Sequence, residues 1–254
     1  MASSSLHTLL LLSDSALPLG SFAFSSGLES FLAHKKLSTT HLSSSASAKL
    51  QACEKFLEEA LHNVSSTALP YVLTALRHPD RLHDLDNDFD ASTPCTVARR
   101  ASIAQGRAMV QIWERALSDS ALAGTPAAGE VARFAVTLKA NVPDEFGLQP
   151  NGHFAPLFGA VCAALDVSEY DTSYLFLLNH AKAVLSAAVR ASVMGPYQSQ
   201  AVLAGAKLRA CLGTCLEMQS RRNVRGVEDA AVVVPLHDLW MGRHELLYSR
   251  IFNS

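Results

Sequence analysis

The sequence predicts an all-α protein built as a single multi-helix, bundle-like domain over residues 1–254. Three observations support this fold class. Apolar residues recur at helical spacing in several segments, they make up 49% of the chain, and strand signals are nearly absent. The β-branched run at 232–234 is isolated, with no sheet to join. A chain of this length buries about 75% of the surface that its unfolded form exposes, which suits one large core.

The first elements are expected on both sides of a segment rich in serine, proline and glycine. Leucines at 9–12 and 28–32 favour a short helix and then a helix from about residue 25. Pro18 and Gly20 prevent one continuous helix between them. After a Ser/Thr/Ala-rich stretch at 38–47, apolar residues recur at steps of three and four. This spacing predicts a helix, with its inner face at Leu50, Cys53, Leu57, Leu61 and Val64.

An acidic segment at 78–94 follows a helix expected over 69–76. Its alternating aspartates suggest a calcium loop, but the turn glycine and the closing glutamate of that motif are missing. We therefore expect 78–94 to be a solvated loop. The segment at 118–129, rich in alanine, glycine and serine, is likewise expected to be a loop.

The second half of the chain favours long helices. They are expected over 96–117, 130–140, 153–165, 168–194 and 199–219. The pair Gly195-Pro196 separates the last two helices, with Ser199 as the expected capping residue. Small residues at four-residue steps, namely Ala155, Gly159 and Ala163, predict close contact between two helices.

Composition limits the compartment and the partners. The formal net charge of −2 offers no basic face for nucleic acid. Five cysteines, odd in number and without a CxxC motif, favour a reduced, intracellular compartment. The start lacks the basic region of a signal peptide. The apolar stretch at 174–194 is interrupted by polar residues, so it fits a bundle core better than a membrane span. These features predict a cytoplasmic protein.

Sequence motifs for catalysis are missing. The chain has no hydrolase elbow, Walker loop, dinucleotide-binding glycines or HExxH, so we expect no enzyme and no catalytic residues. Cys211 and Cys215 have the i, i+4 spacing that can hold a soft metal ion, but two core cysteines explain them better, and no metal ligand is expected. The alternative is a small metal-binding enzyme that uses both cysteines and a nearby histidine.

The two chain ends carry the most unusual composition. The last eleven residues (HELLYSRIFNS) are far more apolar than most termini, and they must be covered by the protein's own body or by a partner. Residues 13–29 (SDSALPLGSFAFSSGLE) are similarly unusual. Together they favour a docking protein over a catalyst.

Five motifs in order resemble the urease accessory protein F (UreF) family. They are the segment at 11–29, Arg100 to Gly106 (RASIAQG), His153 to Gly159 (HFAPLFG), Arg190 with 195–200 (GPYQSQ), and the tail from His244. The chain departs from the family pattern at Phe24, where many members have His or Tyr, and at Pro196-Tyr197, which enlarge the bend. The segments at 38–47, 78–94 and 118–129 resemble flexible insertions of a eukaryotic, fungal-like member of the family.

This resemblance implies an all-α homodimer that binds an accessory protein called UreD or UreH, recruits the nickel-carrying GTPase UreG and docks on apo-urease. The resemblance also implies that the protein has no cofactor of its own, because the complex as a whole handles the nickel. The tail at 243–254 is expected to be disordered alone and ordered on binding. The alternative is regulation of the GTPase cycle through a charge from Glu29 or Arg250. The partner-binding residues implied are Leu17, Pro18, Gly20, Phe22, Phe24, Gly27, Glu29, Arg190, Gly195, Tyr197, Gln198, Gln200, His244, Tyr248, Arg250, Ile251 and Phe252.

Overall fold

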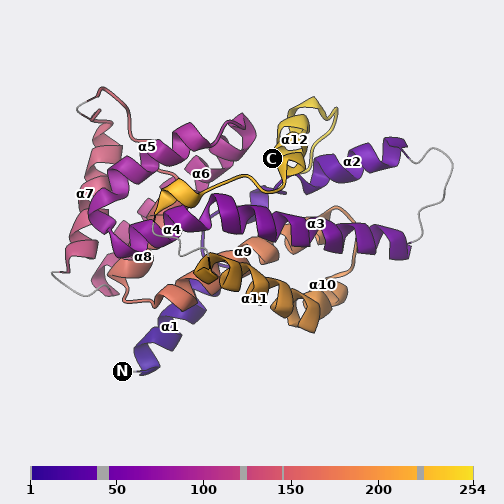
Figure 1. Cartoon of the computed structure of the whole chain (residues 1–254), viewed down its shortest axis with the longest axis horizontal. Coiled ribbons are helices and arrows are strands. Elements are labelled where there is room, and N and C mark those ends of the chain that lie inside the picture. Colours follow the sequence, from indigo (N-terminus) through magenta and orange to yellow (C-terminus); the bar gives the residue numbers. More distant parts are fainter. Residues whose placement is uncertain (1, 39–45, 121–124, 145, 222–225, 254) are drawn as a thin grey trace.

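The computed structural model describes residues 2–38, 46–120, 125–144, 146–221 and 226–253 (Figure 1). Within these ranges the chain is helical and forms no strand, which confirms the all-α class. The helices are α1 (Ala2–Ser13), α2 (Leu28–Ser38), α3 (Ala46–Thr67), α4 (Leu69–Arg77), α5 (Leu82–Ser92), α6 (Thr96–Ile112), α7 (Pro126–Ala140), α8 (Phe154–Ala164), α9 (Glu169–Arg190), α10 (Pro196–Ala204), α11 (Ala206–Arg221) and α12 (Pro235–Arg243). None of these helices is long and apolar enough to cross a membrane.

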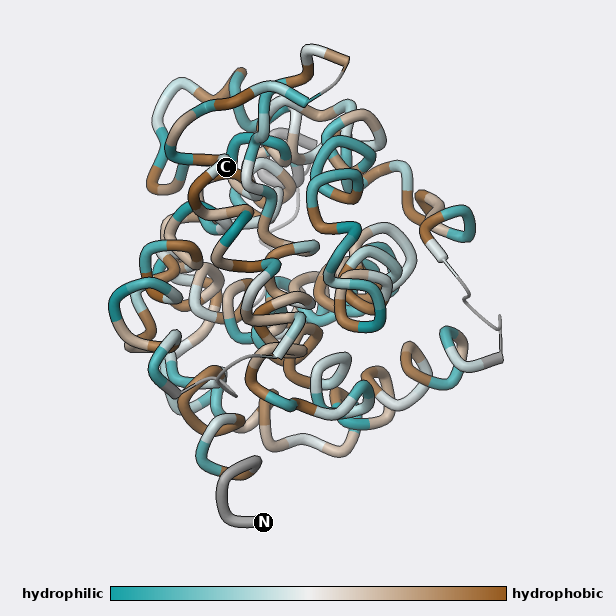
Figure 2. Tube along the Cα trace, turned by 90° about the vertical axis from the view of Figure 1, so that its left-hand side faces the viewer, coloured by the Kyte–Doolittle hydropathy of each residue, from teal (hydrophilic) through white to brown (hydrophobic). Residues whose placement is uncertain are grey.

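Helix α8 lies at the centre of the core and packs against α4, α6 and α7. Its residues from Leu157 to Cys162 are fully or almost fully buried. Gly159 permits the closest approach, because a Cβ atom there would lie 2.0 Å from the carbonyl oxygen of Val72 on α4. The close helix contact expected from the small residues is therefore confirmed at Gly159. Along the outer helices hydrophobic and hydrophilic positions alternate (Figure 2), as expected for amphipathic helices around one core.

The segment at 78–94 is not the solvated loop that its acidity suggested. It forms a short 3₁₀ turn (Pro79–Arg81) and then α5, which buries Leu82, Leu85 and Phe89 at helical spacing. The carboxylate of Asp86 is also buried, and it accepts hydrogen bonds from the backbone N–H groups of residues 151, 152 and 153 at 2.6–3.1 Å. This acidic residue fixes the backbone that leads into α8 instead of facing water.

Three further boundaries differ from expectation. The segment at 118–129 contains a 3₁₀ turn (Ser118–Ser120), and α7 begins at Pro126 after the capping hydroxyl of Thr125. A break at Gly205, which the sequence did not suggest, divides the helix expected over 199–219 into α10 and α11. The remaining parts of the proposed insertions, 39–45 and 121–124, lie outside the described residues.

Candidate functional site

The turn-rich N-terminal segment at 13–29 and the C-terminal tail meet on one side of the molecule, and we call them the joined ends. Helix α1, which precedes them, points away, so its first residues lie far from the tail (Figure 1). The C-terminus lies beside α12 and close to α2 (Figure 1), and the backbone N–H of Asn253 donates to the carbonyl of Ala23 at 2.8 Å. Ala23 belongs to the 3₁₀ turn Ser21–Ala23, which follows the serine- and proline-rich segment. The tail is thus ordered against the chain's own N-terminal region, and the expectation of a tail without structure before partner binding is wrong.

Glu29, in the first turn of α2, holds the two ends together. One carboxylate oxygen accepts from the backbone N–H of Ile251 at 2.7 Å. The other accepts from the N–H of Phe252 at 3.2 Å and from His244 Nε2 at 2.9 Å. The His244 side chain is completely buried, and the Glu29 side chain is 11% exposed. A nearly buried carboxylate is stabilised by three donors of this kind.

A second set of charged side chains contacts the tail. Glu245 forms ion pairs with Arg100 on α6 and with Arg250, and hydrogen bonds from these two residues lower the pKa of Glu245. Arg100 also donates to the carbonyl of Asn253 at 3.2 Å. The guanidinium of Arg190, at the end of α9, lies 4.3 Å from the ring centroid of Phe252 and 5.8 Å from that of Phe22. These contacts connect α6 and α9 to the tail.

Two glycines explain why the N-terminal segment folds in this way. Gly20 and Gly27 have φ angles of +70° and +84°, which residues with a Cβ adopt rarely. A Cβ atom on Gly27 would also lie 3.1 Å from the backbone nitrogen of Met241. Gly27 therefore allows the start of α2 to lie directly against α12, which leads into the tail.

Eleven of the seventeen partner-binding residues implied by the sequence fall into three groups. Phe24, Gly27, His244 and Phe252 are buried, so they hold the chain ends together and offer no surface to a partner. Leu17, Pro18 and Gly20 form the turn before Ser21. The residues at 195–200 begin α10, where Gly195, Tyr197, Gln198 and Gln200 are all exposed. Helix α10 starts at Pro196, so Ser199 lies in its first turn and is not its cap.

Large apolar side chains remain exposed around the joined ends. Ile251 is 62% exposed although its neighbour Phe252 is only 4% exposed, and Tyr248 is fully exposed. Phe22 lies near the end of the tail, because Arg190 contacts the rings of both Phe22 and Phe252 and because residues 23 and 253 share a hydrogen bond. We call this set the terminal surface, and it consists of Phe22, Leu246, Tyr248 and Ile251.

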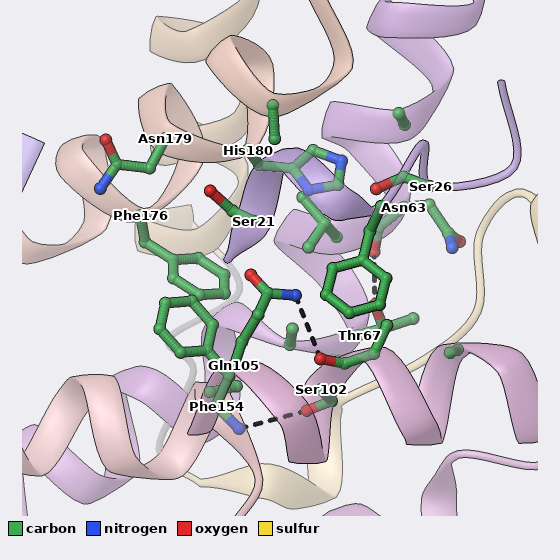
Figure 3. A pocket seen from close by; sticks show the side chains of 18 of the residues that line it. Ser21, Ser26, Asn63, Thr67, Ser102, Gln105, Phe154, Phe176, Asn179 and His180 are labelled. Carbon is green, nitrogen blue, oxygen red and sulfur yellow. Dashed lines mark hydrogen bonds between the residues drawn. The ribbon is translucent and has the colours of Figure 1, made fainter. Parts of the chain in front are cut away.

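A cavity of about 340 Å³ lies beneath the N-terminal segment. It is lined by residues between Leu12 and Ser26 and by parts of α3, α6, α9 and α12. Figure 3 shows aromatic rings from Phe154 and Phe176 beside polar side chains such as Asn63, Gln105 and His180. Cavities of this size and mixed polarity are typical of binding pockets.

Two histidines that line this cavity are held in the neutral form. Burial, together with a smaller effect of the nearby His237, lowers the pKa of His180 to about 4. Burial likewise lowers the pKa of His237 to about 4. Their Nε2 atoms are buried without a hydrogen-bond partner among the described residues. Lys182 Nζ, on the same helix as His180, donates to the carbonyl of Ser13 at 2.6 Å and fixes the N-terminal segment over the cavity.

Sequence reasoning missed several residues that shape the site. Arg100 and Glu245 were part of quoted motifs but were not assigned a role, and their pairing spans 145 positions. Arg243 donates to His34 on α2 at 3.0 Å, which adds another link between the ends. The available signal was that the motif at 100–106 carries a positive charge and the tail a negative one. Nothing in the sequence shows that these two charges form a pair.

Comparison with known proteins defines the class of this helical protein. It is similar to a UreF-like urease accessory protein of Schizosaccharomyces pombe, with 36% identity over 98% of the chain and 97% of the relative. Urease accessory protein F of Arabidopsis thaliana is 31% identical, over 95% of the chain and 89% of the relative. Urease accessory protein 6 of Cryptococcus neoformans is 29% identical, over 98% and 97%.

These relatives place the chain among the urease accessory proteins. The model of the UreF family matches residues 48–207, which is more than half of the chain. The protein belongs to the UreF family. The resemblance drawn from the five sequence motifs is thereby confirmed.

Proposed function

We propose that this protein is a non-catalytic scaffold in the maturation of urease. In this proposal the terminal surface binds an accessory protein of the UreD/UreH type, and the pair recruits a GTPase of the UreG type to apo-urease. Family membership supports the role in urease maturation. The observation that carries the docking role is the terminal surface itself, because exposed apolar groups on a rigid frame are typical of protein interfaces.

The anchoring of the tail by Glu29 matters because it reduces the entropic cost of binding a partner. Glu29 fixes the backbone at residues 251 and 252, so a partner does not have to order this part of the tail. A surface that is ordered before binding loses less conformational entropy in the complex. Tyr248 and Ile251 are the expected anchors, since aromatic and large apolar side chains dominate the binding energy of most interfaces.

The chemistry of nickel gives a reason for such a scaffold. Ni²⁺ binds histidine and cysteine side chains tightly, so free ions occupy wrong ligands, and wrong ions occupy nickel sites. Delivery within a protein complex avoids both errors. In this proposal the nickel is cargo of the complex, and the scaffold acts in the cytoplasm as a homodimer that needs no cofactor for docking.

The docking role is tested with the variants Tyr248→Ala and Ile251→Ala of the full chain. The assay is binding of a purified UreD/UreH-type partner, measured by calorimetry or by pull-down at defined concentrations. We expect each variant to bind at least about tenfold more weakly, because anchor truncations cost about 2 kcal/mol or more. Urease activation in a cell that lacks the native protein should fall in parallel.

Tyr170→Ala is the matched control. Tyr170 is 66% exposed, but it lies at the start of α9 and outside the terminal surface. Its variant should bind like the unaltered protein. Full affinity in both tail variants, or an equal loss in all three, would contradict docking through the terminal surface. Point variants are preferable to deletion of 243–254, because deletion also removes the buried His244 and Phe252.

Regulation of the partner GTPase remains the alternative prediction. Glu29 is engaged within the chain, so Arg250, which is 41% exposed, is the better candidate for a charge near the nucleotide. Single-turnover GTP hydrolysis by the UreG-type protein, with and without this chain, decides the question. Equal rates would remove the alternative, and a rate increase lost in Arg250→Ala would establish it.

A further inference from the structure

Three potential metal ligands come together where α3 and α11 run side by side (Figure 1). His62 lies on α3, and Cys211 and Cys215 lie one turn apart on α11. Their nitrogen and sulfur atoms all lie within 4.8 Å of one another. The histidine is 153 positions away from Cys215, so the sequence offered only the two cysteines, and a pair of core residues was the better interpretation.

The helices on both sides of this cluster are fixed in register. One turn before the cysteines, Lys207 forms ion pairs with Glu58 at 2.7 Å and with Glu54 at 3.4 Å on α3. One turn after them, Gln219 donates to the carbonyl of Ser65. Contacts above and below the cluster therefore hold the three ligands in place, and a metal ion would require little rearrangement.

The spacing matches a tetrahedral ion. Typical zinc–sulfur and zinc–nitrogen bonds place neighbouring sulfur and nitrogen ligands about 3.6 Å apart at the tetrahedral angle. In this protein Cys215 Sγ lies 3.6 Å from His62 Nδ1. Cys215 is buried, while Cys211 and His62 are only half-buried, so the cluster borders solvent on one side. This leaves an open fourth position for water or for a ligand from another molecule.

The other core cysteines differ from this pair in their surroundings. Burial raises the pKa values of Cys53 and Cys162 to about 12, which keeps those core thiols protonated. Neither belongs to the group of ligand atoms around His62.

We propose that His62, Cys211 and Cys215 form a binding site for one thiolate-preferring divalent metal ion, with a fourth coordination position open to solvent. Two thiolates and one imidazole are a set that soft or borderline ions such as Zn²⁺ prefer over Mg²⁺ or Ca²⁺. The two thiolates also balance the charge of a divalent ion. The site is independent of the terminal surface, and neither proposal depends on the other.

Titration of the reduced, metal-free full chain with Co²⁺ tests the proposal. We expect one ion per chain, a charge-transfer band from thiolate to cobalt in the near ultraviolet, and the strong visible bands of tetrahedral Co²⁺. Zn²⁺ should displace Co²⁺, and competition with a coloured chelator gives the affinity. A parallel titration with Ni²⁺ shows whether the same thiolates also accept the cargo ion of the proposed function.

Cys211→Ser and His62→Gln are the diagnostic variants, and Cys95→Ser is the control. Cys95 is half-buried at the start of α6, outside the cluster. Each diagnostic variant should abolish the thiolate band or weaken Zn²⁺ binding more than about 100-fold, beyond the usual 10- to 100-fold effect of an outer-shell change. Circular dichroism confirms that the variants fold. Octahedral Co²⁺ spectra, no binding at micromolar concentrations, or losses equal to those of Cys95→Ser would overturn the site.

Discussion

Glu29→Gln is the most direct test of how the two chain ends are joined. Glutamine retains the shape of glutamate but replaces one carboxylate oxygen with an NH₂ group. If its remaining oxygen faces His244 and the N–H of Phe252, its NH₂ group faces the N–H of Ile251, which then has no acceptor. The substitution therefore removes one hydrogen bond, and it removes the negative charge from the other two.

The magnitude follows from these three hydrogen bonds. A hydrogen bond to a charged group contributes about 1.5–3 kcal/mol, against about 1 kcal/mol for a neutral one. One lost bond at the partly exposed Ile251 and two weakened bonds together amount to about 2–3 kcal/mol. At about 1.4 kcal/mol for each factor of ten, the tail should open about 30- to 150-fold more often.

Hydrogen exchange measured by mass spectrometry reports this opening. The amides of residues 251–253 should exchange about 30- to 150-fold faster in the variant, while the core around α8 keeps its protection, because tail opening is local. Glu59→Gln is the control, since Glu59 forms a surface pair with Lys55 at 3.7 Å and lies outside the joined ends. Unchanged exchange at 251–253 in Glu29→Gln would refute the role given to this carboxylate.

Two further predictions concern the interior. The pKa values of about 4 for His180 and His237 lie below the usual 6.5, so both stay neutral in the fold while the unfolded chain binds protons. This stabilisation is complete above pH 6.5 and is lost as the pH falls towards 4, by up to about 3 kcal/mol for each histidine. Urea unfolding between pH 7 and 4 should show this slope, and a slope unchanged in His180→Gln would contradict it. Gly159→Ala should lower the free energy of unfolding by more than about 3 kcal/mol, because its Cβ would lie 2.0 Å from the Val72 oxygen. Gly129→Ala, where a Cβ meets nothing within 4 Å, should instead add up to about 1 kcal/mol, so similar effects from both variants would contradict the packing argument.

Much of the fold was predictable because the long helices carry strong periodicity. The segment at 78–94 was misread because its aspartates outweighed a weaker signal. Leu82, Leu85 and Phe89 have helical spacing, and they proved to be the buried side of α5. No local signal showed that Asp86 would be buried, since its backbone partners are 65–67 positions away.

The sequence indicated the two segments that form the candidate site, but it did not indicate that they contact each other. The apolar tail and the turn-rich N-terminal segment were recognisable from composition. Their contact depends on Glu29 meeting His244 and Phe252, which lie 215 and 223 positions away. For the same reason the tail was expected to need a partner, although the chain's own carboxylate supplies the acceptors that order it. Cys211 and Cys215 likewise gained His62 only through the packing of α3 against α11.

The geometry at Glu29 also explains why the terminal surface is apolar and exposed at the same time. A single carboxylate binds the backbone N–H groups of two successive residues, 251 and 252. Phe252 is then directed inward, under the guanidinium of Arg190, while Ile251 faces solvent. Rotating the tail to bury Ile251 would break both hydrogen bonds and expose the Phe252 ring. The exposure of Ile251 is therefore imposed by the anchoring of the tail, and water is excluded from this side chain only when another molecule covers it.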